Sequence, residues 1–482
     1  RWWWHSRGYT PAGVECWNGI RGIDYLLSRP DVDAGRLAVT GISGGGAATF
    51  WIAAADERVQ IAAPVSGMAD LLAYVPNRVI NGHCDCMFSY NTYRWPWTRI
   101  AALIAPRPLL FANSDQDRIF PMDANERIIN RLERVYSLHG ASDAVDGFVR
   151  VGGHAYREDL RRGIFRFINL RLKNDPRAVA DSEVDLVAGS GNQRKHPIDP
   201  VELRVFPADS DLPADELNTT IDRVFVPLAK VAVPKQGEFD QWKRGLTEQL
   251  REVSFGATPA RIPPAKLLEQ TSPTEIRLET ELGIRVRLQY AAVFKPTAKV
   301  KRVLLVVVDE KQKVPFPEWL HELHQPGDAV YLCESRGIGW TKWTRKNPPN
   351  YVERSHVLLG RTVDTGRVWD AVAAARFLRE KHGETIPVHA TGEGAAGVIA
   401  AYAALWEPEI EGVAVHRPPL SHMESDAPQF LNALRVCDVP DVFGMLAPRP
   451  LTISGRPTKT LSKTTAIYQA AGAGDALTVR PE

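Results

Sequence analysis

The stretch Arg36-Leu-Ala-Val-Thr-Gly-Ile-Ser-Gly-Gly-Gly46 decides the fold of this 482-residue chain. An apolar run typical of a buried strand ends at Thr40, and residues 47–55 then follow a small-residue helical pattern. The turn between them, Gly-x-Ser-x-Gly, forces Ser43 into strained dihedral angles, and a side chain at Gly41 or Gly45 would collide with the strand or helix beside it. The sequence therefore predicts a Ser43 hydroxyl at a helix N-terminus, where backbone N–H groups favour a developing anion.

An acid and a histidine follow in the order Ser, Asp, His, each just after a predicted strand. The acid loop after the strand at 108–113 offers two candidates, Asp115 and Asp117. We favour Asp117, because it lies closer to the turn from which the next helix starts, and interpret Asp115 as a loop or capping residue. The histidine is His154, which two glycines precede in the turn after the strand at 146–151. The glycines let the chain swing this histidine over the edge of the sheet.

These residues predict the roles of an acyl-transfer triad. Ser43 attacks an acyl carbon, and His154 removes its proton and later returns one to the leaving group. Asp117 fixes the imidazole tautomer and stabilises its charged form. The backbone N–H of Gly44 is the expected first oxyanion donor, and we expect the second donor to lie before residue 1.

Composition and charge limit the classes of function. Hydrophobic residues make up 44% and charged residues 24% of the chain, so we expect ordinary globular cores in two or three domains. The formal net charge of +2 gives no reason to expect nucleic acid or an anionic membrane as partner, and no apolar run approaches the length of a membrane span. Of the five cysteines, only Cys84 and Cys86 lie close together, without the further ligands of a tetrahedral metal site. We expect neither a metal nor a cofactor.

The excursion at residues 69–98 is rich in aromatic residues. Insertions above the carboxyl ends of the strands cover the active site in folds of this kind. Two interpretations stay open. The aromatic rings pack against one another in a lid, or Tyr90, Trp95 and Trp97 form a surface on which a sugar ring stacks.

The order of the elements predicts the domains. A domain at 1–175 is followed by an ordered linker with one helix at 176–270, and by a second domain at 271–482. Only one loop and one helix precede the nucleophile strand, although a sheet of this type has several earlier strands. We therefore expect a chain that is cut at its N-terminus and lacks those strands.

An internal repeat predicts that the second domain has the fold of the first. The helical pattern at 17–26 matches that at 369–378 with an offset of 352, and Ala105-Pro-Arg-Pro108 recurs as Ala447-Pro-Arg-Pro450 with an offset of 342. The matching segments occur in the same order and at nearly the same spacing in the two domains.

The chemistry is not repeated. The elbow corresponds to Gly392-Glu-Gly-Ala-Ala396, which puts Gly394 at the position of the nucleophile. The acid loop becomes residues 454–459, which contain no carboxylate, and no Gly-Gly-His follows. We interpret this domain as a degenerate, non-catalytic companion.

The first domain resembles the bacterial acetyl xylan esterase and dienelactone-hydrolase-like families of α/β-hydrolases. The motifs that carry the resemblance are Thr40-Gly-Ile-Ser-Gly-Gly-Gly46, Ile104-Ala-Pro-Arg-Pro-Leu-Leu-Phe-Ala-Asn113, Asp117-Arg-Ile-Phe-Pro121 and Gly152-Gly-His154. The resemblance implies an α/β-hydrolase fold and cofactor-free hydrolysis of acyl esters, often acetyl groups on plant polysaccharides, by a secreted or periplasmic enzyme. Ala155 departs from the pattern, which often has an acidic residue after the histidine.

We therefore predict a serine esterase that deacetylates a plant-type polysaccharide such as acetylated xylan, with small-molecule or polysaccharide esters as substrates. Two alternatives stay open. A serine peptidase of the prolyl-oligopeptidase type has a similar elbow, and a protein derived from a hydrolase could bind a glycan without turnover.

Overall fold

The computed structural model describes residues 3–82, 90–180, 201–202, 204–296, 299–311, 316–343 and 351–481. The chain forms two compact units. The first unit comprises Thr10–Ser89 and Trp95–Phe225, and the second comprises Arg1–Tyr9, Tyr90–Arg94 and Val226–Glu482. Among the described residues, no helix has both the length and the apolar character that crossing a membrane requires.

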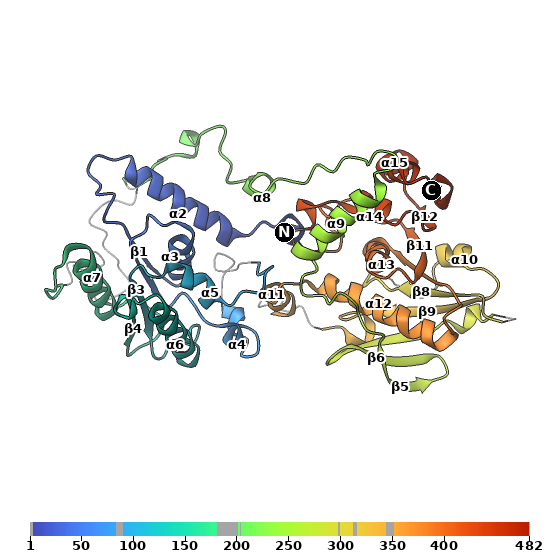
Figure 1. Ribbon diagram of the computed structural model, residues 1–482, viewed down its shortest axis with the longest axis horizontal. Coiled ribbons are helices and arrows are strands. Elements are labelled where there is room, and N and C mark those ends of the chain that lie inside the picture. The colour runs from blue at the N-terminus through green and yellow to red at the C-terminus, as the bar shows by residue number, and fades with distance from the viewer. Residues whose placement is uncertain are drawn as a thin grey trace. The chain divides into compact units, whose positions relative to one another are not determined.

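The first unit is built on a parallel sheet whose described strands have the order β1-β2-β3-β4, drawn from blue to teal in Figure 1. Its strands are β1 (Ala38–Ile42), β2 (Ile61–Val65), β3 (Leu109–Ser114) and β4 (Val145–Arg150). Its helices are α2 (Pro11–Leu27), α3 (Gly44–Ala55), α4 (Leu71–Tyr74), α5 (Trp97–Ala101), α6 (Met122–Leu138), α7 (Glu158–Lys173) and α8 (Ile221–Val224). Short 3-10 turns are η1 (Val79–Gly82), η3 (Ala102–Ile104), η4 (Ser142–Ala144) and η5 (Asp209–Asp211).

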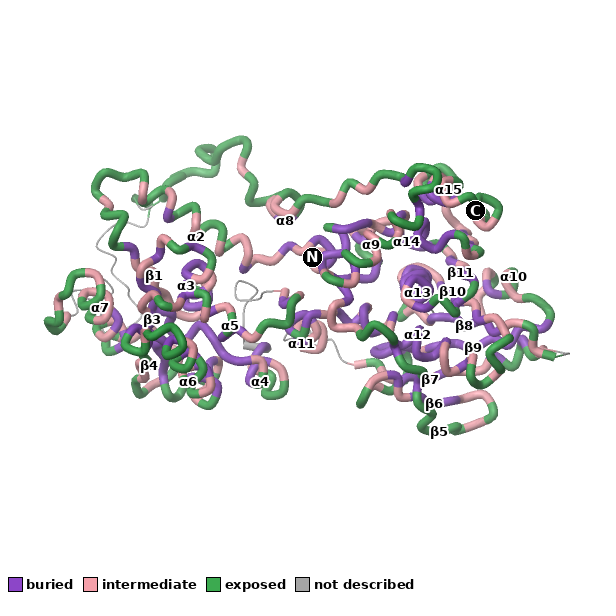
Figure 2. The backbone as a smooth tube through the Cα atoms, viewed as in Figure 1, coloured by how far each residue is buried: buried purple, intermediate pink, exposed green. Residues whose placement is uncertain are grey.

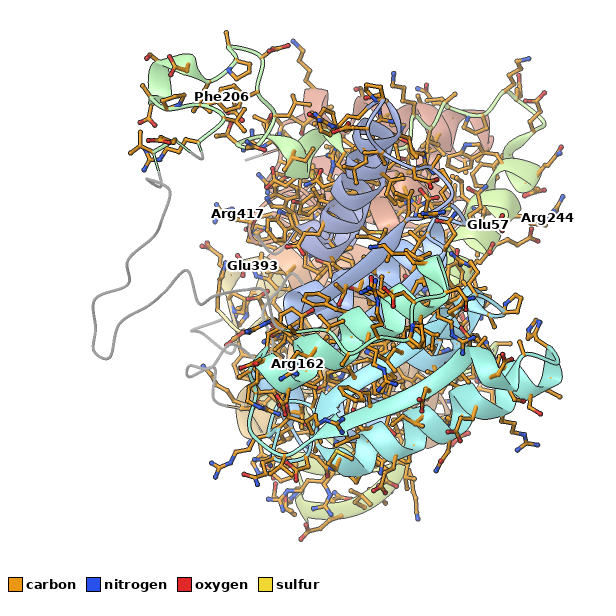
Figure 3. The ribbon with its side chains drawn as sticks, turned by 90° about the vertical axis from the view of Figure 1, so that its left-hand side faces the viewer. Glu57, Arg162, Phe206, Arg244, Glu393 and Arg417 are labelled. Carbon is orange, nitrogen blue, oxygen red and sulfur yellow. The ribbon has the colours of Figure 1, made fainter. Side chains whose placement is uncertain are left out.

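Apolar spacing explains how the helices pack on this sheet. Every residue of β2 and β3 is buried, as expected for central parallel strands. Helix α7 buries Leu160 and Ile164 against Leu110 and Ala112 of β3. Its other side carries exposed residues such as Arg162, which is labelled in Figure 3. The predicted strand–turn–helix around Ser43 is present as β1, the turn and α3.

The second unit contains a nine-stranded sheet with the order β13-β12-β11-β10-β8-β9-β7-β6-β5 among the described residues. Its strands are β5 (Lys266–Ser272), β6 (Glu275–Glu281), β7 (Ile284–Tyr290), β8 (Arg302–Val307), β9 (Asp328–Glu334), β10 (Val388–Glu393), β11 (Ile410–His416), β12 (Leu451–Ser454) and β13 (Leu477–Arg480). Strands β8 to β13 are parallel, whereas β5, β6 and β7 pair antiparallel.

The helices of the second unit are α1 (Trp4–Arg7), α9 (Phe239–Val253), α10 (Glu318–Leu323), α11 (Tyr351–Leu358), α12 (Val363–His382), α13 (Gly394–Trp406), α14 (Val439–Met445) and α15 (Ser462–Ala470). Its 3-10 turns are η6 (Ala292–Phe294), η7 (Gly339–Thr341), η8 (Ala433–Arg435), η9 (Thr458–Leu461) and η10 (Gly474–Ala476). Figure 2 shows α13 and the neighbouring strands in purple, because they form the buried centre of this unit.

The described residues of the expected linker at 176–270 are divided between the two units. Helix α9, which the sequence predicts within it, buries Phe239, Leu246 and Leu250 in the core of the second unit. Its apolar positions form one face of an amphipathic helix, and that face needs a partner. The division between the units falls instead at Phe225 and Val226.

Local geometry repeats between the units where the sequence repeat aligns them. Nη1 of Arg107 donates to the carbonyls of Asp56 and Val59, at 3.1 and 2.7 Å. Nη1 of Arg449 donates to the carbonyls of Glu407 and Ile410, at 3.3 and 3.0 Å. In each unit a tyrosine hydroxyl then donates to the carbonyl of that arginine, from Tyr136 and from Tyr468. The same side-chain bonds therefore hold both Ala-Pro-Arg-Pro segments.

The backbone of the two elbows also repeats. Ser43 has φ 58°, and Gly394 has φ 57°. Gly41 faces the backbone of Gly45 so closely that a Cβ on Gly41 would lie 2.8 Å from it. A Cβ on Gly392 would lie 2.6 Å from the backbone of Ala396. The second unit thus keeps the shape of the turn without the serine.

Candidate active site

Ser43 lies on a strained turn between β1 and α3. Its dihedral angles, φ 58° and ψ −117°, are sparsely populated for a residue with a side chain, and such strain marks functional turns. The close approach at Gly41 was expected, but that at Gly45 was not found, because a Cβ there would meet nothing within 4 Å. Gly46 is the second tight position, since its Cβ would lie 2.4 Å from the carbonyl oxygen of Val65. The turn therefore needs glycine at 41 and 46.

Asp117 and His154 are joined by a hydrogen bond. His154 Nδ1 lies 2.8 Å from Oδ2 of Asp117, and the Asp117 residue is 3% exposed. A carboxylate only accepts hydrogen bonds, so Nδ1 carries the hydrogen and Nε2 is left as the acceptor. The other oxygen, Oδ1, accepts from the backbone N–H groups of Ile119 and Phe120, at 2.9 and 3.0 Å. These bonds fix the carboxylate and, through it, the tautomer of the imidazole.

The competing acid, Asp115, has a different partner. Its Oδ1 accepts from the backbone N–H of Gly152 at 2.8 Å, so it ties the acid loop to the glycine turn before His154. This is the loop role that the sequence analysis assigned to Asp115.

Two groups that sequence reasoning missed hold the acid and histidine loops. Nη1 of Arg157 donates to Ser114 Oγ and to the carbonyl of Gly153, each at 3.0 Å. The side-chain amides of Asn113 and Asn125 both donate to the carbonyl of Phe120, at 3.2 and 2.9 Å. Asn113 is the last residue but one of β3 and Arg157 lies three residues after the histidine, but these residue types carry no distinctive pattern at such positions.

The ring of Phe120 completes the setting of the histidine. It stacks on the imidazole of His154 with 5.7 Å between the ring centroids and an angle of 22° between the planes. The side chain of His154 is 27% exposed, so the imidazole is both supported and open to a substrate.

The three predicted triad residues share one edge of the sheet. Ser43 follows β1, Asp117 follows β3 and His154 follows β4, and the carboxyl ends of parallel strands lie at the same edge. Among the described residues, the Ser43 hydroxyl makes no hydrogen bond, so His154 is bonded to Asp117 but not to Ser43. Catalytic hydrogen bonds are often long without substrate and tighten in the complex.

One of the three aromatic residues proposed for sugar stacking is buried in the core of the first unit. Trp97 is 3% exposed and packs edge-on against Trp51 and Tyr74, with ring centroids 5.5 and 6.2 Å apart. The prediction that Trp97 stacks on a sugar is therefore wrong, because a ring buried in the core offers no face to a ligand.

The other two aromatic residues differ in environment. Trp95 is 37% exposed and has the guanidinium of Arg99 at 6.0 Å from its ring. Tyr90 belongs to the second unit and packs against His5 with 5.0 Å between the ring centroids. Of the three, only Trp95 keeps an exposed ring within the first unit. Cys84 and Cys86 lie outside the described residues, within which no group of three or more potential metal ligands is found.

Comparison with known proteins gives matches to hydrolases. The model of the prolyl oligopeptidase family matches residues 2–144. The “Putative hydrolase YtaP” of Bacillus subtilis (strain 168) is 27% identical over 162 residues, which are 33% of this chain and 54% of that protein. The chain thus spans about half the length of the curated relative it matches.

Two solved structures are also similar to this chain. A carbohydrate esterase family 15 glucuronoyl esterase from Caldicellulosiruptor kristjansonii is 13% identical with a TM-score of 0.38, over 52% of this chain and 81% of its own. Acetyl xylan esterase 1 from Thermoanaerobacterium sp. JW/SL YS485 is 13% identical with a TM-score of 0.31, over 52% of this chain and 87% of its own. With its parallel sheet, its strained serine turn and the family match, the first unit has the α/β-hydrolase fold.

Proposed function

We propose that the first unit is a serine esterase that removes acetyl groups from a plant-type polysaccharide such as acetylated xylan. The observation that carries the proposal is the 2.8 Å bond between Asp117 and His154, at the sheet edge where the elbow presents Ser43. An acid that orients a histidine at the same sheet edge as a half-buried serine is the kind of arrangement that acyl transfer uses. The ester substrate is inferred from the resemblance of the elbow, acid and histidine motifs to acetyl xylan esterases.

The proposed reaction has two stages. Nε2 of His154 takes the proton of the Ser43 hydroxyl as the oxygen bonds to the ester carbonyl carbon. The backbone N–H of Gly44 stabilises the resulting oxyanion. When the intermediate collapses, the bond to the sugar oxygen breaks and His154 returns the proton to that oxygen. Water then attacks the acetyl-enzyme by the same route and releases acetate.

A second candidate is peptide hydrolysis. It is favoured by the match of residues 2–144 to the prolyl oligopeptidase family, whose name is that of a peptidase group. The same triad would then cleave an amide, with the proton of His154 passing to the leaving amine.

We also propose that the second unit is a degenerate α/β-hydrolase domain. This is supported by the elbow at Gly394, which keeps the turn of Ser43, and by the repeated bonds of Arg107 and Arg449. Glycine has no side chain, so Gly394 supplies no nucleophile and the unit is non-catalytic. We further propose that the protein acts outside the cytoplasm, where its polysaccharide substrate would be found.

One set of assays separates these candidates. Acetate release from acetylated xylan and cleavage of prolyl peptides are measured for the chain and for its Ser43→Ala variant. We expect acetate release that Ser43→Ala abolishes and no peptide cleavage. Serine-dependent peptide cleavage without acetate release would favour the peptidase. Turnover that persists in Ser43→Ala would contradict both.

A further inference from the structure

The second unit contains a cavity of about 920 Å³. It lies at the carboxyl ends of β8, β10 and β11, and its wall includes Asp309, Gly394, Ala395 and Arg417. This volume falls in the range of pockets that bind drug-sized ligands. Glu393 and Arg417, which are both labelled in Figure 3, come from the ends of two neighbouring strands.

The cavity occupies the place in the second unit that Ser43 occupies in the first. Gly394 repeats the backbone of Ser43, and Arg417 has φ 44°, the same as Ser66 in the first unit. Both residues of the second unit follow their counterparts by 351 positions. A Cβ on Gly394 would meet nothing within 4 Å. The cavity is therefore open at the position that corresponds to the Ser43 side chain of the first unit.

Some polar groups of the cavity wall are left without a partner. Nη1 of Arg367 donates to Asp364 at 2.9 Å, but its Nη2 is buried and has no hydrogen-bond partner among the described residues. Oε2 of Glu393 accepts from Trp319 Nε1 at 3.2 Å, and within the described part of the chain no hydrogen bond reaches its Oε1. A buried N–H without an acceptor costs free energy, so a ligand that supplies one gains affinity. Glu393 thus offers an acceptor at the wall, and Arg367, another residue of the wall, holds a buried donor without a partner among the described residues.

The mixed charges of the wall favour a neutral ligand. Charged side chains of both signs line it together: four are basic (Lys311, Lys342, Arg367, Arg417) and six are carboxylates (Asp309, Glu310, Glu353, Asp364, Glu393, Asp426). A cation would meet the basic groups, and an anion would meet the carboxylates. Burial is the main cause that raises the pKa of Asp309, so this part of the wall disfavours a charged group. A hydroxyl both donates and accepts, so a ligand with many hydroxyls can satisfy groups of both kinds.

We propose that this cavity binds a neutral oligosaccharide without cleaving it, through Arg367, Glu393 and the open elbow at Gly394. The inference deepens the proposed function, on which the choice of a saccharide rests. Without a hydroxyl at Gly394, the bound sugar meets no nucleophile from the elbow.

The test measures binding in the Ser43→Ala chain, which removes turnover at the proposed triad. Xylohexaose, cellohexaose and mannohexaose are titrated calorimetrically, with oligogalacturonate and chitosan hexamer as charged probes. We expect at least one neutral hexamer to bind and both charged probes to bind more weakly. No binding of any neutral hexamer, or tighter binding of a charged probe, would overturn the proposal.

Variants then locate the site. Ala395→Trp fills the cavity and Glu393→Ala removes one acceptor, so each should weaken binding by about tenfold or more. Glu384→Ala, at an exposed carboxylate outside the cavity wall, should leave binding unchanged. If Ala395→Trp does not fold, Glu393→Ala decides alone. Unchanged affinity in the folded cavity variants would contradict the assignment.

The two proposals can fail separately. Binding by the cavity without acetate release in the Ser43-containing chain would leave the inference standing and remove the esterase. Acetate release by the Ser43-containing chain, with no hexamer bound by Ser43→Ala, would support the esterase and remove the inference about the cavity.

Discussion

Asp117 and His154 are 37 residues apart in sequence, yet Oδ2 of the aspartate accepts a hydrogen bond from the imidazole at 2.8 Å. The aspartate is buried and its other oxygen is held by two backbone N–H groups. This carboxylate can therefore orient the ring without moving, which is what a histidine needs if it is to act as a general base. Asp115, two residues earlier, binds the glycine turn instead.

Because the two aspartates have different partners, we predict that replacing each by asparagine changes kcat to a different extent. Asp117→Asn should lower kcat for an aryl acetate by about 10⁴-fold, because the amide favours the wrong imidazole tautomer. Asp115→Asn keeps an oxygen that can accept from Gly152, so its kcat should change by less than about tenfold. Both values come from steady-state assays at pH 7. Equal losses in the two variants would contradict the assignment of Asp117.

The second prediction concerns the nucleophile. A fluorophosphonate probe should form a covalent bond from phosphorus to Ser43 Oγ with loss of fluoride, because the reaction resembles acyl transfer. Peptide mass spectrometry should find the added mass on the peptide that contains Ser43. In His154→Ala the labelling rate should fall by about 10²-fold or more, since the general base is lost. Labelling at another serine with Ser43 unmodified would refute this role.

The strands, the helices and the order of the candidate site could be predicted because their signals are local. The apolar run that ends at Thr40 indicated β1, and the small-residue pattern at 47–55 indicated α3. The glycines around Ser43 indicated the turn, because few other residues fit it. The choice between Asp115 and Asp117 used only the distance to the next helix, and it did not foresee that Asp115 binds Gly152 while Asp117 binds His154.

What could not be predicted depends on contacts between distant segments. Trp97 looks like any lid aromatic in the sequence, and only Trp51 and Tyr74 show that it faces the core. Arg157 acts through a carbonyl at Gly153, and no residue pattern records such a bond. The tight glycine is Gly46 rather than Gly45 because Val65, on another strand, approaches it.

The third prediction concerns pH and stability. Arg127 binds the buried carboxylate of Asp70, at 2.5 and 3.0 Å. Burial opposes the ionisation of Asp70, but the bonds from Arg127 and from the Ala73 N–H outweigh it and lower its pKa. A carboxyl with a lowered folded-state pKa stabilises the fold above its unfolded pKa of about 4, and this contribution is lost as the pH falls through the folded pKa.

Arg127→Met should therefore lower the free energy of unfolding at pH 7 by about 1–3 kcal/mol, since it leaves the Asp70 charge without its partner. The difference from the unmodified chain should shrink at pH 3, where Asp70 of the variant is protonated. Urea unfolding of both chains at pH 7 and at pH 3 measures this difference in the free energy of unfolding. Asp123→Asn, at an exposed partner of the same arginine, should change stability by less than about 0.5 kcal/mol. A loss for Arg127→Met that is the same at both pH values would contradict the linkage.

The last prediction compares two adjacent glycines of the elbow helix. A Cβ on Gly46 would lie 2.4 Å from the carbonyl oxygen of Val65 and 2.8 Å from Cα of Gly67, and this backbone cannot easily yield. Gly46→Ala should therefore destabilise the chain by about 1–3 kcal/mol and lower esterase activity, because the helix that carries Ser43 must shift. Gly45 has open space around its Cβ and lies in the first turn of α3, where alanine is a better helix former. Gly45→Ala should keep its stability or gain about 0.5 kcal/mol. Urea unfolding and acetate release on the same samples test the pair, and a larger loss for Gly45→Ala would mean that the helix approaches β2 at a different residue.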